Sequence, residues 1–580
     1  MSKPFVIIGI NAYHADASAA VFVNGELVAA IEEERINRVK HWAGFPELSI
    51  AFCLQEAGIS FADVDVWAIG RDTKAKLAAK LSYLFTNGAG SLKGLQQRLQ
   101  NRGKIAGLPE QLAIISGLPT SHFKNKIASV EHHRSHLASA FFASPFKEAA
   151  CLSIDGSGDF STTMTAMGKH NTLDVLQSVN FPHSLGFFYT AFTQLLGFPH
   201  YGDEYKVMGM APYGSPKYAA ELQKLVTCTA DGLFSLDLSY FTRGMSGIVS
   251  YGDNHVPVVA PLFTEKLAVQ FGPVREQDAP ITQYHKDLAA SVQQVTEQVL
   301  FHILNHLHTK TGSTNVCIAG GVAQNSVANG KITRNTPFKN VYIPPAGHDA
   351  GIAMGAALYV QHQQKNMHRF HMSSACTGSK FTNEEIAAAL EAQNIVYDTL
   401  PDEELYNIVT DCLINGGVVG WMTGRSEFGP RALGGRSILA DPRRTDAKEI
   451  LNTKIKRRES FRPFAPSILE PFVAAYFELN EPVPFMEKVF PIKPEKQALI
   501  PAVTHVDGSG RLQVVNKQTS PRYYALIENF YNKTGIPILV NTSFNENEPI
   551  VNTPQQALDC YLRNDMDMLV MENIVVRRQR

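Results

Sequence analysis

The chain of 580 residues carries 53 lysines and arginines against 54 aspartates and glutamates, a formal net charge of −1 at pH 7. This balance argues against recruitment to nucleic acid or to an anionic membrane by global charge. A chain of this length exceeds a single hydrophobic core, so we expect two or more domains. The seven cysteines form no CxxC pair, which argues against a zinc module or a disulfide framework.

The N-terminal ten residues are typical of a first β-strand, not of a signal peptide. No apolar run approaches the roughly 20 residues that a membrane helix needs. We therefore expect a soluble, cytoplasmic protein with neither a membrane nor a nucleic acid as partner.

The first elements are a strand and a hairpin, and the same order returns further along. Asn24-Gly25 between two apolar runs is a strong two-residue hairpin signal. The strands are expected at residues 5–10, 19–23 and 27–31, and again at 150–154, 162–167 and 173–178. A strand followed by a hairpin, found twice, predicts two structurally related halves.

Strands, glycine loops and helices alternate in the middle of the chain. A long helical pattern is followed by a strand and the loop 320–325, and a second strand leads into the loop 344–351. The helices are expected at residues 283–308 and 352–360, and the strands at 316–319 and 341–343. This order indicates an α/β architecture built around nucleotide-binding loops.

A polar segment without apolar periodicity, residues 361–380, is the candidate linker. A second α/β unit follows, which opens with two helices and a strand and leads into an arginine-rich loop. Its first elements are expected at residues 383–393, 403–415 and 418–422.

Two histidines and two aspartates are the candidate metal ligands. His132 and His136 are four residues apart, so on a helix they would share one face. Such a pair alone is more often two surface histidines. Asp155 and Asp349 end apolar strands in glycine-rich loops, although each alone is equally a turn-former or a helix N-cap. Together the four predict a mixed site that suits iron, manganese or zinc.

Three glycine-rich loops follow strands, and their backbone N–H groups are candidates to contact a nucleotide phosphate. In isolation each loop is more simply a tight turn. No GxxxxGK[ST] sequence occurs, so none is a P-loop. The candidate contacts are Gly156, Gly320, Gly321 and Asn325.

Cations gather between residues 424 and 462, where eleven lysines and arginines stand against five acidic residues. A solvated basic face or an RNA-binding patch is one interpretation. Glycines and prolines interleave these arginines, however, as is typical of guanidinium groups held rigidly to bind planar or phosphate anions. Arg522, Asn541 and Ser543 lie in later loops that supply further donors.

Near the start, His14 follows the first strand, and Lys40 and His41 follow the hairpin. Helix capping and a charged, solvated helix explain these residues as well as a reacting pocket does. Both interpretations stay open at this point.

Seven motifs, in order, make the chain similar to a known family. They are HHxxH, IDGSGD, AGGVAQN, PPAGHDAG, GRSEFGPRALGGRS, FRPFAPS and NTSFN, and they resemble the NodU/CmcH-type O-carbamoyltransferases. The resemblance spans essentially the whole chain. It implies a larger ASKHA-type (actin/hsp70-like, duplicated) N-terminal domain at residues 1–365 and a smaller YrdC-like α/β domain at residues 378–580.

The resemblance also implies an activity. The C-terminal domain would convert carbamoyl phosphate and ATP, accompanied by Mg²⁺, to carbamoyl adenylate. The N-terminal domain would then transfer the carbamoyl group to a hydroxyl of a small molecule at a site holding Fe²⁺ or another divalent metal. A homodimer is implied as well.

Residue roles follow from the same resemblance. His132, His136, Asp155 and Asp349 match the metal ligands, and Lys40 matches an N-terminal active-site lysine. The catalytic set is His14, Lys40, Arg431 and Lys456, and the carbamoyl phosphate and nucleotide contacts include Arg431, Lys456, Arg462, Arg522, Asn541 and Ser543. His14-Ala-Asp16 carries one residue more than the family's usual His-Asp pair, and Asn37 replaces a frequent threonine. Both departures lie in the N-terminal pocket, so they concern the acceptor contacts more than the metal site.

Two alternatives remain. One is a non-catalytic, nucleotide-sensing ASKHA protein, and the other is a carbamoyl or threonylcarbamoyl transferase that acts on a macromolecule. The pocket for the acceptor is expected in residues 180–207 and 251–281, where no motif is visible.

Overall fold

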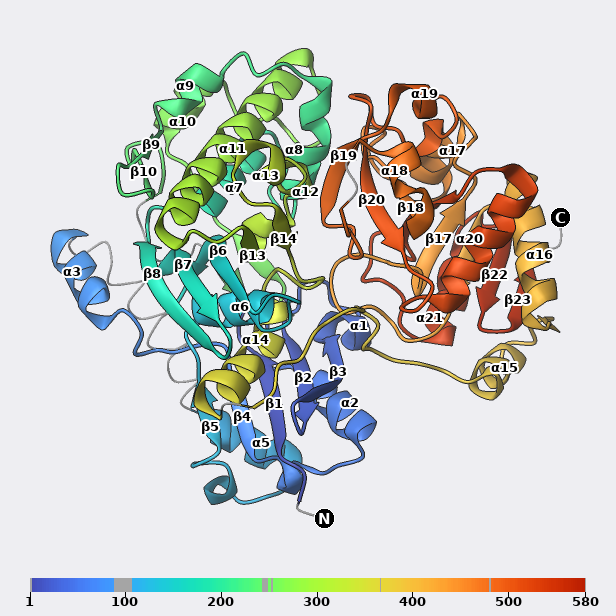
Figure 1. Ribbon diagram of the computed structural model, residues 1–580, viewed down its shortest axis with the longest axis horizontal. Coiled ribbons are helices and arrows are strands. Elements are labelled where there is room, and N and C mark those ends of the chain that lie inside the picture. Colours follow the sequence, from blue (N-terminus) through green and yellow to red (C-terminus); the bar gives the residue numbers. More distant parts are fainter. Residues whose placement is uncertain are drawn as a thin grey trace. The chain divides into compact units, whose positions relative to one another are not determined.

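The computed structural model describes residues 3–87, 107–242, 249–251, 254–365, 367–478 and 481–578 (Figure 1). Its internal contacts divide the chain into two compact units. The first comprises residues 1–325 and 332–372, and the second comprises 326–331 and 373–580. The main division therefore lies within the segment in which the sequence predicts a linker.

The first sheet of unit 1 is built around β1 (Val6–Asn11). β1 pairs antiparallel with β2 (Ser18–Val23) and parallel with β4 (Val66–Ile69). β3 (Glu26–Glu32) and β5 (Ile127–Ser129) complete the order β3-β2-β1-β4-β5. Asn24 and Gly25 both have positive φ, +52° and +95°, as a type I′ hairpin requires, so the predicted hairpin is confirmed.

The second sheet of unit 1 repeats this topology. β6 (Glu148–Gly158) pairs antiparallel with β7 (Ser161–Lys169) and parallel with β13 (Asn315–Ala319). With β8 (Thr172–Asn180) and β14 (Asn340–Tyr342) the order is β14-β13-β6-β7-β8. In each sheet the first strand has a hairpin on one side and two parallel strands on the other. The predicted duplication of the N-terminal domain is therefore confirmed.

Helices α6 (His132–Phe141) and α14 (Gly351–Tyr359) pack against each other, α6 against β6 and β13, and α14 against β1 and β2. Small residues permit this close approach. A Cβ at Gly355 would lie 1.9 Å from the Ser135 carbonyl oxygen, and a Cβ at Gly9 would lie 1.8 Å from that of Ala353. The two halves of unit 1 can therefore pack together this closely because α14 consists mostly of small residues.

The remaining elements of unit 1 lie around these sheets, and the long helix α11 (Gln283–Thr311) packs against α7, α8, α9 and β6. The others are α1 (Glu33–Asn37), α2 (Glu47–Ala57), α3 (Leu77–Asn87), α5 (Leu108–Ser116), α7 (Leu185–Leu195), α8 (Glu204–Met210), α9 (Ala219–Gln223), α10 (Glu265–Phe271), α13 (Ile332–Asn335), β9 (Val226–Cys228), β10 (Phe234–Leu236), β11 (Val249–Tyr251) and β12 (Pro257–Val259).

The described part of unit 2 forms a nine-stranded mixed sheet in the order β15-β23-β22-β16-β17-β21-β18-β20-β19. Its strands are β15 (Asp398–Thr399), β16 (Val419–Met422), β17 (Arg436–Ala440), β18 (Ala465–Leu469), β19 (Lys488–Pro491), β20 (Ser509–Val515), β21 (Ile538–Ser543), β22 (Met568–Met571) and β23 (Ile574–Arg577). Its helices are α15 (Asn383–Glu391), α16 (Asp402–Ile414), α17 (Ala447–Ile450), α18 (Val473–Tyr476), α19 (Pro494–Gln497), α20 (Pro521–Thr534) and α21 (Pro554–Arg563). The predicted α/β class is confirmed.

One short piece of the middle of the chain belongs to unit 2. Helix α12 (Ser326–Asn329) lies beside β19, where the Asn329 side-chain amide donates a 3.0 Å hydrogen bond to the Glu487 carbonyl oxygen. A Cβ at Gly330 would lie 1.8 Å from the Val489 carbonyl oxygen, so this backbone approach requires glycine.

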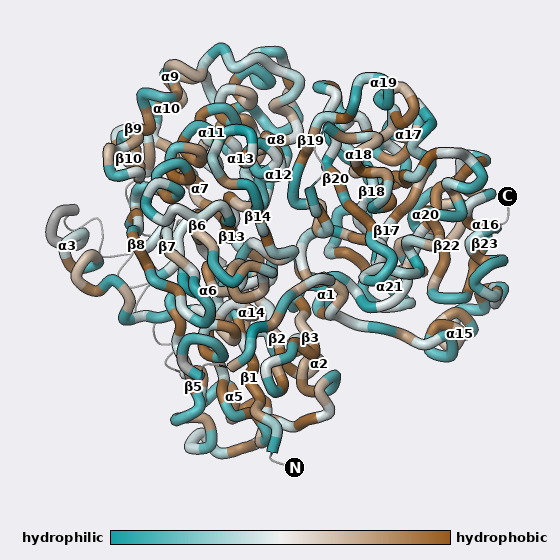
Figure 2. The backbone as a smooth tube through the Cα atoms, in the orientation of Figure 1, coloured by the Kyte–Doolittle hydropathy of each residue, from teal (hydrophilic) through white to brown (hydrophobic). Residues whose placement is uncertain are grey.

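Each unit is built on its own apolar strands, which appear brown in Figure 2. β1 and β16 are buried along their whole length. In unit 2 the fully buried Trp421 donates from its indole nitrogen to the Gly434 carbonyl oxygen at 3.0 Å. This hydrogen bond holds the first part of the arginine-rich segment, residues 424–462, against the core. Among the described residues, no helix has the length and apolar character that crossing a membrane would require.

Candidate metal and anion sites

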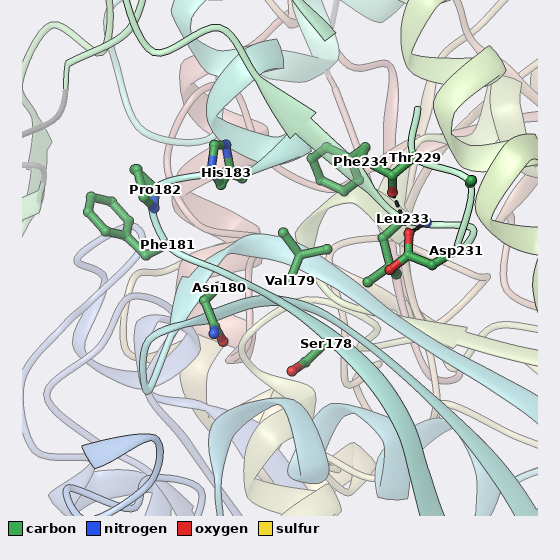
Figure 3. Close-up of a pocket in the computed structure, with 11 residues that line it drawn as sticks. Ser178, Val179, Asn180, Phe181, Pro182, His183, Thr229, Asp231, Leu233 and Phe234 are labelled. Carbon is green, nitrogen blue, oxygen red and sulfur yellow. Dashed lines mark hydrogen bonds between the residues drawn. The ribbon is translucent and has the colours of Figure 1, made fainter. Parts of the chain in front are cut away.

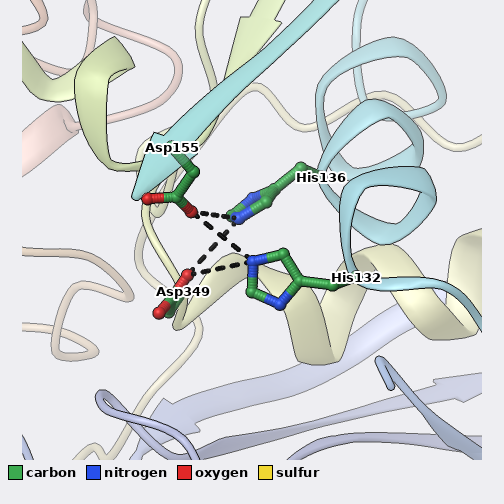
Figure 4. Close-up of side chains that lie close together, drawn as sticks. All are labelled: His132, His136, Asp155 and Asp349. Carbon is green, nitrogen blue, oxygen red and sulfur yellow. Dashed lines mark hydrogen bonds and ion pairs between the residues drawn. The ribbon is translucent and has the colours of Figure 1, made fainter. Parts of the chain in front are cut away.

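Four side chains from three elements converge in unit 1 (Figure 4). His132 and His136 come from the first turns of α6, Asp155 from β6, and Asp349 from the loop before α14. His136 Nε2 lies 2.9 Å from Asp155 Oδ2 and 3.4 Å from Asp349 Oδ1. His132 Nε2 lies 3.5 Å and 3.6 Å from the same two oxygens. The structure thus brings together all four residues that the sequence predicts as ligands.

The spacing of these donors fits a divalent cation. Donors that each lie about 2.1 Å from one ion are separated from each other by about 3.0 to 3.4 Å, depending on the coordination angle. The four donor atoms here lie within 4.8 Å of one another. His132 Nε2 and Asp349 Oδ1 are buried and form no hydrogen bond within the described structure. Two nitrogen and two oxygen donors suit iron, manganese or zinc.

Burial and mutual contact shift the pKa values of the side chains in this cluster. Burial alone would raise the pKa of the Asp155 carboxyl, but its interactions with the His132 and His136 imidazoles lower it well below its usual range. Burial would also raise the pKa of Asp349, but the charge of His14 and the interaction with His136 lower it. Burial would lower the pKa of His136, whereas the two aspartates raise it to about 9. Both carboxylates are therefore ionised and need positive charge beside them.

Glycines bring the backbone against these ligands. A Cβ at Gly158 would lie 2.0 Å from the His132 ring, and one at Gly321 would lie 2.7 Å from Asp155 Oδ1. Gly320 has φ +102°, and its Cβ would lie 2.2 Å from the Ile154 carbonyl oxygen. The glycine segment after residue 154 is the irregular end of β6, where the register with β7 shifts, and not a free loop.

Of the predicted phosphate contacts, Gly156 and Gly321 lie against Asp155 and Gly320 lies against Ile154. Gly156 donates its backbone N–H to Asp155 Oδ1 at 2.7 Å. The Asn325 amide exchanges hydrogen bonds of 2.9 and 3.0 Å with Gln293 on α11. These groups shape the site, and nucleotide binding by Gly156, Gly320, Gly321 and Asn325 stays a prediction.

The two N-terminal candidates occupy different environments. His14 Nδ1 lies 2.6 Å from Asp349 Oδ2, so His14 joins the ligand cluster. Lys40 is exposed. The exposure of Lys40 agrees with a solvated, charged segment, but within α1 the charged Glu33 and Arg35 are buried at 2% and 1% exposure. Glu33 accepts hydrogen bonds from the Ser49 backbone and hydroxyl, both at 2.7 Å, which anchors α1 to α2.

In unit 2, Lys456 is buried and held by oxygen acceptors. Its Nζ donates to Ser543 Oγ at 3.2 Å, and to the backbone and side-chain oxygens of Asn545 at 2.8 and 2.7 Å. Burial lowers the pKa of Lys456 well below its usual range, and the charges of Arg458 and Arg462 add to this effect.

Arg511 on β20 is a candidate that the sequence did not reveal. Burial, followed by the charges of Arg431, Arg458 and Arg462, lowers the pKa of its guanidinium group. Arg511 Nε is buried without a hydrogen-bond partner within the described structure. Arg431, Lys456, Arg458, Arg462 and Arg511 form what we call the cation cluster. Like charges held this close attract an anion.

Two other predicted contacts are placed differently. Asn541 donates to the Ala432 carbonyl oxygen at 3.1 Å and to Gln513 Oε1 at 2.8 Å, so it joins β21 to the loop that carries Arg431. Arg522, on α20, lies 3.4 Å from Glu572 and 3.3 Å from Asp402. The charge of Arg522 is thus paired with carboxylates of another part of unit 2.

A pocket of about 530 Å³ opens in unit 1 between the segments 178–183 and 229–234 (Figure 3). None of the predicted site residues lines it. Residues 180–183 belong to the stretch in which the sequence predicts acceptor contacts, and that assignment stays a prediction.

Comparisons with known proteins match both units. The family model "Carbamoyltransferase N-terminus" matches residues 6–358, and "Carbamoyltransferase C-terminus" matches residues 410–578. Nodulation protein NolNO of Sinorhizobium fredii is 36% identical, covering 98% of this chain and 80% of that protein. An uncharacterised protein of Synechocystis sp. is 43% identical, covering 99% of this chain and 96% of that protein.

Solved structures are more distant. HypF of T. kodakarensis superposes with a TM-score of 0.30 at 14% identity, covering 63% of this chain and 48% of that one. This likeness is too weak to bear on function.

Removal of one metal ligand tests the first site. We expect His136→Ala to abolish stoichiometric binding of a divalent metal, measured by elemental analysis. At a free metal concentration of a hundred times Kd, binding stabilises a fold by about 2.7 kcal/mol, so the metal-induced rise in Tm should also disappear. His306→Ala is the matched control, since His302 and His306 are also four residues apart, on α11. Equal metal binding by wild type and His136→Ala would contradict the assignment.

An anion titration tests the cation cluster. Charge-assisted hydrogen bonds contribute about 1.5–3 kcal/mol, so Arg511→Gln should weaken pyrophosphate binding roughly 10- to 100-fold by calorimetry. The Tm without anion should not fall, because the change removes a buried cation from among like charges. Arg444→Gln is the control, since Arg444 is paired with Asp446 outside the cluster. Unchanged pyrophosphate affinity in Arg511→Gln would exclude Arg511 from the site.

Proposed function

This chain belongs to the carbamoyltransferase family and is a carbamoyltransferase, and on that premise we propose that it is an ATP-dependent O-carbamoyltransferase for a small hydroxylated molecule. Unit 2 would form carbamoyl adenylate from carbamoyl phosphate and ATP with Mg²⁺. Unit 1 would transfer the carbamoyl group to a hydroxyl of a natural product or a sugar.

The cation cluster supports the first half-reaction. Carbamoyl phosphate and the ATP phosphates are anionic, and arginines bind such groups in bidentate fashion. Lys456 is held beside Arg458 and Arg462 through Ser543 and Asn545, so its position is fixed before a ligand arrives. Fixed donors stabilise charge that develops on phosphate oxygens without reorganising during the reaction.

The four-ligand cluster supports the second half-reaction. His132, His136, Asp155 and Asp349 would hold Fe²⁺ or another divalent cation, which supplies a Lewis acid for the carbamoyl oxygen. His14 would hold Asp349 in its orientation through the 2.6 Å contact. Burial of this cluster limits the access of water, to which an activated carbamoyl group would otherwise be lost.

The observation that carries the proposal is the pairing of these sites within one chain of this family. A cluster that needs a cation lies in the unit matched by the N-terminal model. A group of cations suited to an anion lies in the unit matched by the C-terminal model. A nucleotide sensor without catalysis requires neither four metal ligands nor a site for carbamoyl phosphate.

The direct test is a reaction with ATP, Mg²⁺ and carbamoyl phosphate. We expect release of pyrophosphate that depends on carbamoyl phosphate. Mass spectrometry should then find the gain of one carbamoyl group on a member of a panel of sugars, aminocyclitols and other hydroxylated metabolites. If ATP turnover did not depend on carbamoyl phosphate, the proposal would fail and a sensing role would be favoured.

Single substitutions should separate the two half-reactions. His132→Ala removes a metal ligand, so transfer should stop while pyrophosphate release continues. Arg462→Ala removes a cation from the other cluster, so pyrophosphate release should be lost first. Both rates are measured in parallel, with thermal melts as the control for folding. Equal loss of pyrophosphate release in both variants would refute the division of labour.

A further inference from the structure

A second imidazole–carboxylate pair lies outside the four-ligand cluster. His41 Nδ1 lies 2.7 Å from Asp16 Oδ1, and the two side chains are 26% and 7% exposed. The backbone N–H of His41 donates to Glu34 Oε2 at 2.7 Å. The imidazole is therefore held both by its own backbone and by a buried carboxylate.

The loop after β1 connects this pair to the four-ligand cluster. His14 reaches Asp349, and two residues later Asp16 reaches His41. Asn11 fixes the loop, because its side-chain amide donates to the Ala15 and Asp16 carbonyl oxygens, both at 3.0 Å. Tyr13, Asp16 and His41 all have φ of +57°, a left-handed conformation that non-glycine residues rarely adopt. Such strain persists only where the surrounding structure enforces it, and it is concentrated at functional sites.

The second ring nitrogen of His41 is open. No hydrogen bond of Nε2 is found within the described part of the chain, and Nε2 is not buried. It lies beside Gly202, where a Cβ would come within 2.9 Å. Gly202 has φ +83°, so both its conformation and its missing side chain leave room at this nitrogen. The Tyr201 ring packs edge-on against the imidazole at a centroid distance of 5.2 Å.

Charged groups from several elements face this imidazole. Asp16, Glu34 and Glu204 contribute negative charge, and Lys40 contributes positive charge. His348 also lies nearby, but burial lowers its pKa, which favours its neutral form. Burial would lower the pKa of His41, but the charge and hydrogen bond of Asp16 raise it. Burial raises the pKa of Tyr201, and the charges of Asp16, Asp349 and Asp155 raise it further. The His41–Asp16 pair and the four-ligand cluster therefore lie in one region of unit 1.

We propose that His41, oriented by Asp16, is the general base that takes the proton of the acceptor hydroxyl; this inference rests on the proposed function. The hydroxyl O–H bond breaks, and its proton goes to His41 Nε2. The oxygen forms a bond to the carbamoyl carbon, and the bond from that carbon to the leaving phosphate oxygen breaks, with its electron pair leaving on the phosphate. His41 then returns the proton to solvent. Asp16 is a positioning residue that keeps the Nδ1–H toward itself and Nε2 free to accept.

His14, on the same loop as Asp16, is also paired with a carboxylate, but its partner differs. Asp349 is a member of the four-ligand cluster, so it shares its charge with the histidines and with any cation held there. Asp16 has no such competitor among the four ligands. The positive charge that develops on an imidazole taking up a proton is therefore better supported at His41.

The test compares wild type with His41→Ala on whichever sugar or aminocyclitol of the panel the wild type carbamoylates. General-base catalysis contributes about 10²–10⁴-fold, so kcat for transfer should fall by that factor with KM little changed. Pyrophosphate release dependent on carbamoyl phosphate should persist, which also shows that the variant folds. Added imidazole should restore part of kcat, because the removed ring leaves a space beside Gly202.

Asp16→Asn tests the positioning role. Without the carboxylate the pKa of His41 falls, so the base is neutral at lower pH. The acidic limb of the kcat profile should therefore move to lower pH, while kcat on the plateau decreases. A residue with only a structural role would not move this limb.

His368→Ala is the matched control. His368 is hydrogen-bonded to Glu26 at 2.8 Å, but the two side chains are 57% and 66% exposed. The kcat of His368→Ala for carbamoyl transfer should equal that of wild type. Undiminished kcat in His41→Ala would overturn the proposal, and so would loss of kcat with neither imidazole rescue nor a shifted pH limb.

Two further outcomes are distinguishable. Loss of a bound metal in His41→Ala would also overturn the proposal, because Asp16, Glu34 and His41 would then form a cation site. If wild type carbamoylates no member of the panel, the proposed function fails first and the inference falls with it.

Discussion

Two ionised carboxylates buried side by side are the constraint on which unit 1 depends. Asp155 and Asp349 are close enough to repel each other, so each requires a compensating positive group within a few ångströms. The first turns of α6 provide two imidazoles at the helical spacing that lets both face the same point. Loss of one imidazole would leave buried charge unpaired, which costs about 3–5 kcal/mol where it has been measured in proteins.

The duplicated architecture explains why these groups meet. β1 and β6 hold the same central position in their sheets, and polar residues follow the apolar part of each strand. In the half built on β6 the polar residue that follows the apolar part of the strand is Asp155. In the half built on β1 the loop after the strand carries His14 and Asp16. In open α/β sheets, ligands bind beyond the carboxyl ends of the strands. Small residues in α14 bring the halves close enough for both sets to reach one region.

Regular elements could be predicted from the sequence because their signals are local. The strand predicted at residues 5–10 is observed at Val6–Asn11, and the helix predicted at residues 403–415 is observed at Asp402–Ile414. The hairpin at Asn24-Gly25 follows from backbone preference alone. The four ligands were found because two lie at helical spacing and two end apolar strands.

The rest depends on contacts between distant residues. Asp16 and His41 are separated by 25 positions, and positive φ at non-glycine residues gives no signal in the sequence. Arg511 lies in a buried strand without the flanking glycines and prolines that marked the other arginines. Arg511 reaches the cation cluster because β20 pairs with β18 and β19, which a sequence pattern does not reveal. The same reasoning explains α12, whose membership of unit 2 comes from its contact with β19.

The two units concentrate charge of opposite sign. For this reason we expect ligands of opposite charge to stabilise them. Unit 1 gathers ionised carboxylates, and we propose that a cation binds between them. Unit 2 gathers guanidinium groups around Arg511, and we propose that an anion binds there. A ligand that binds only the folded state stabilises that state by an amount that rises with the logarithm of the ligand concentration once the ligand exceeds its Kd. Each unit should therefore be stabilised by its own ligand. In unit 2 we propose that the stabilising anion is the phosphate group of the reaction itself, so binding of substrate would offset the repulsion within the cation cluster.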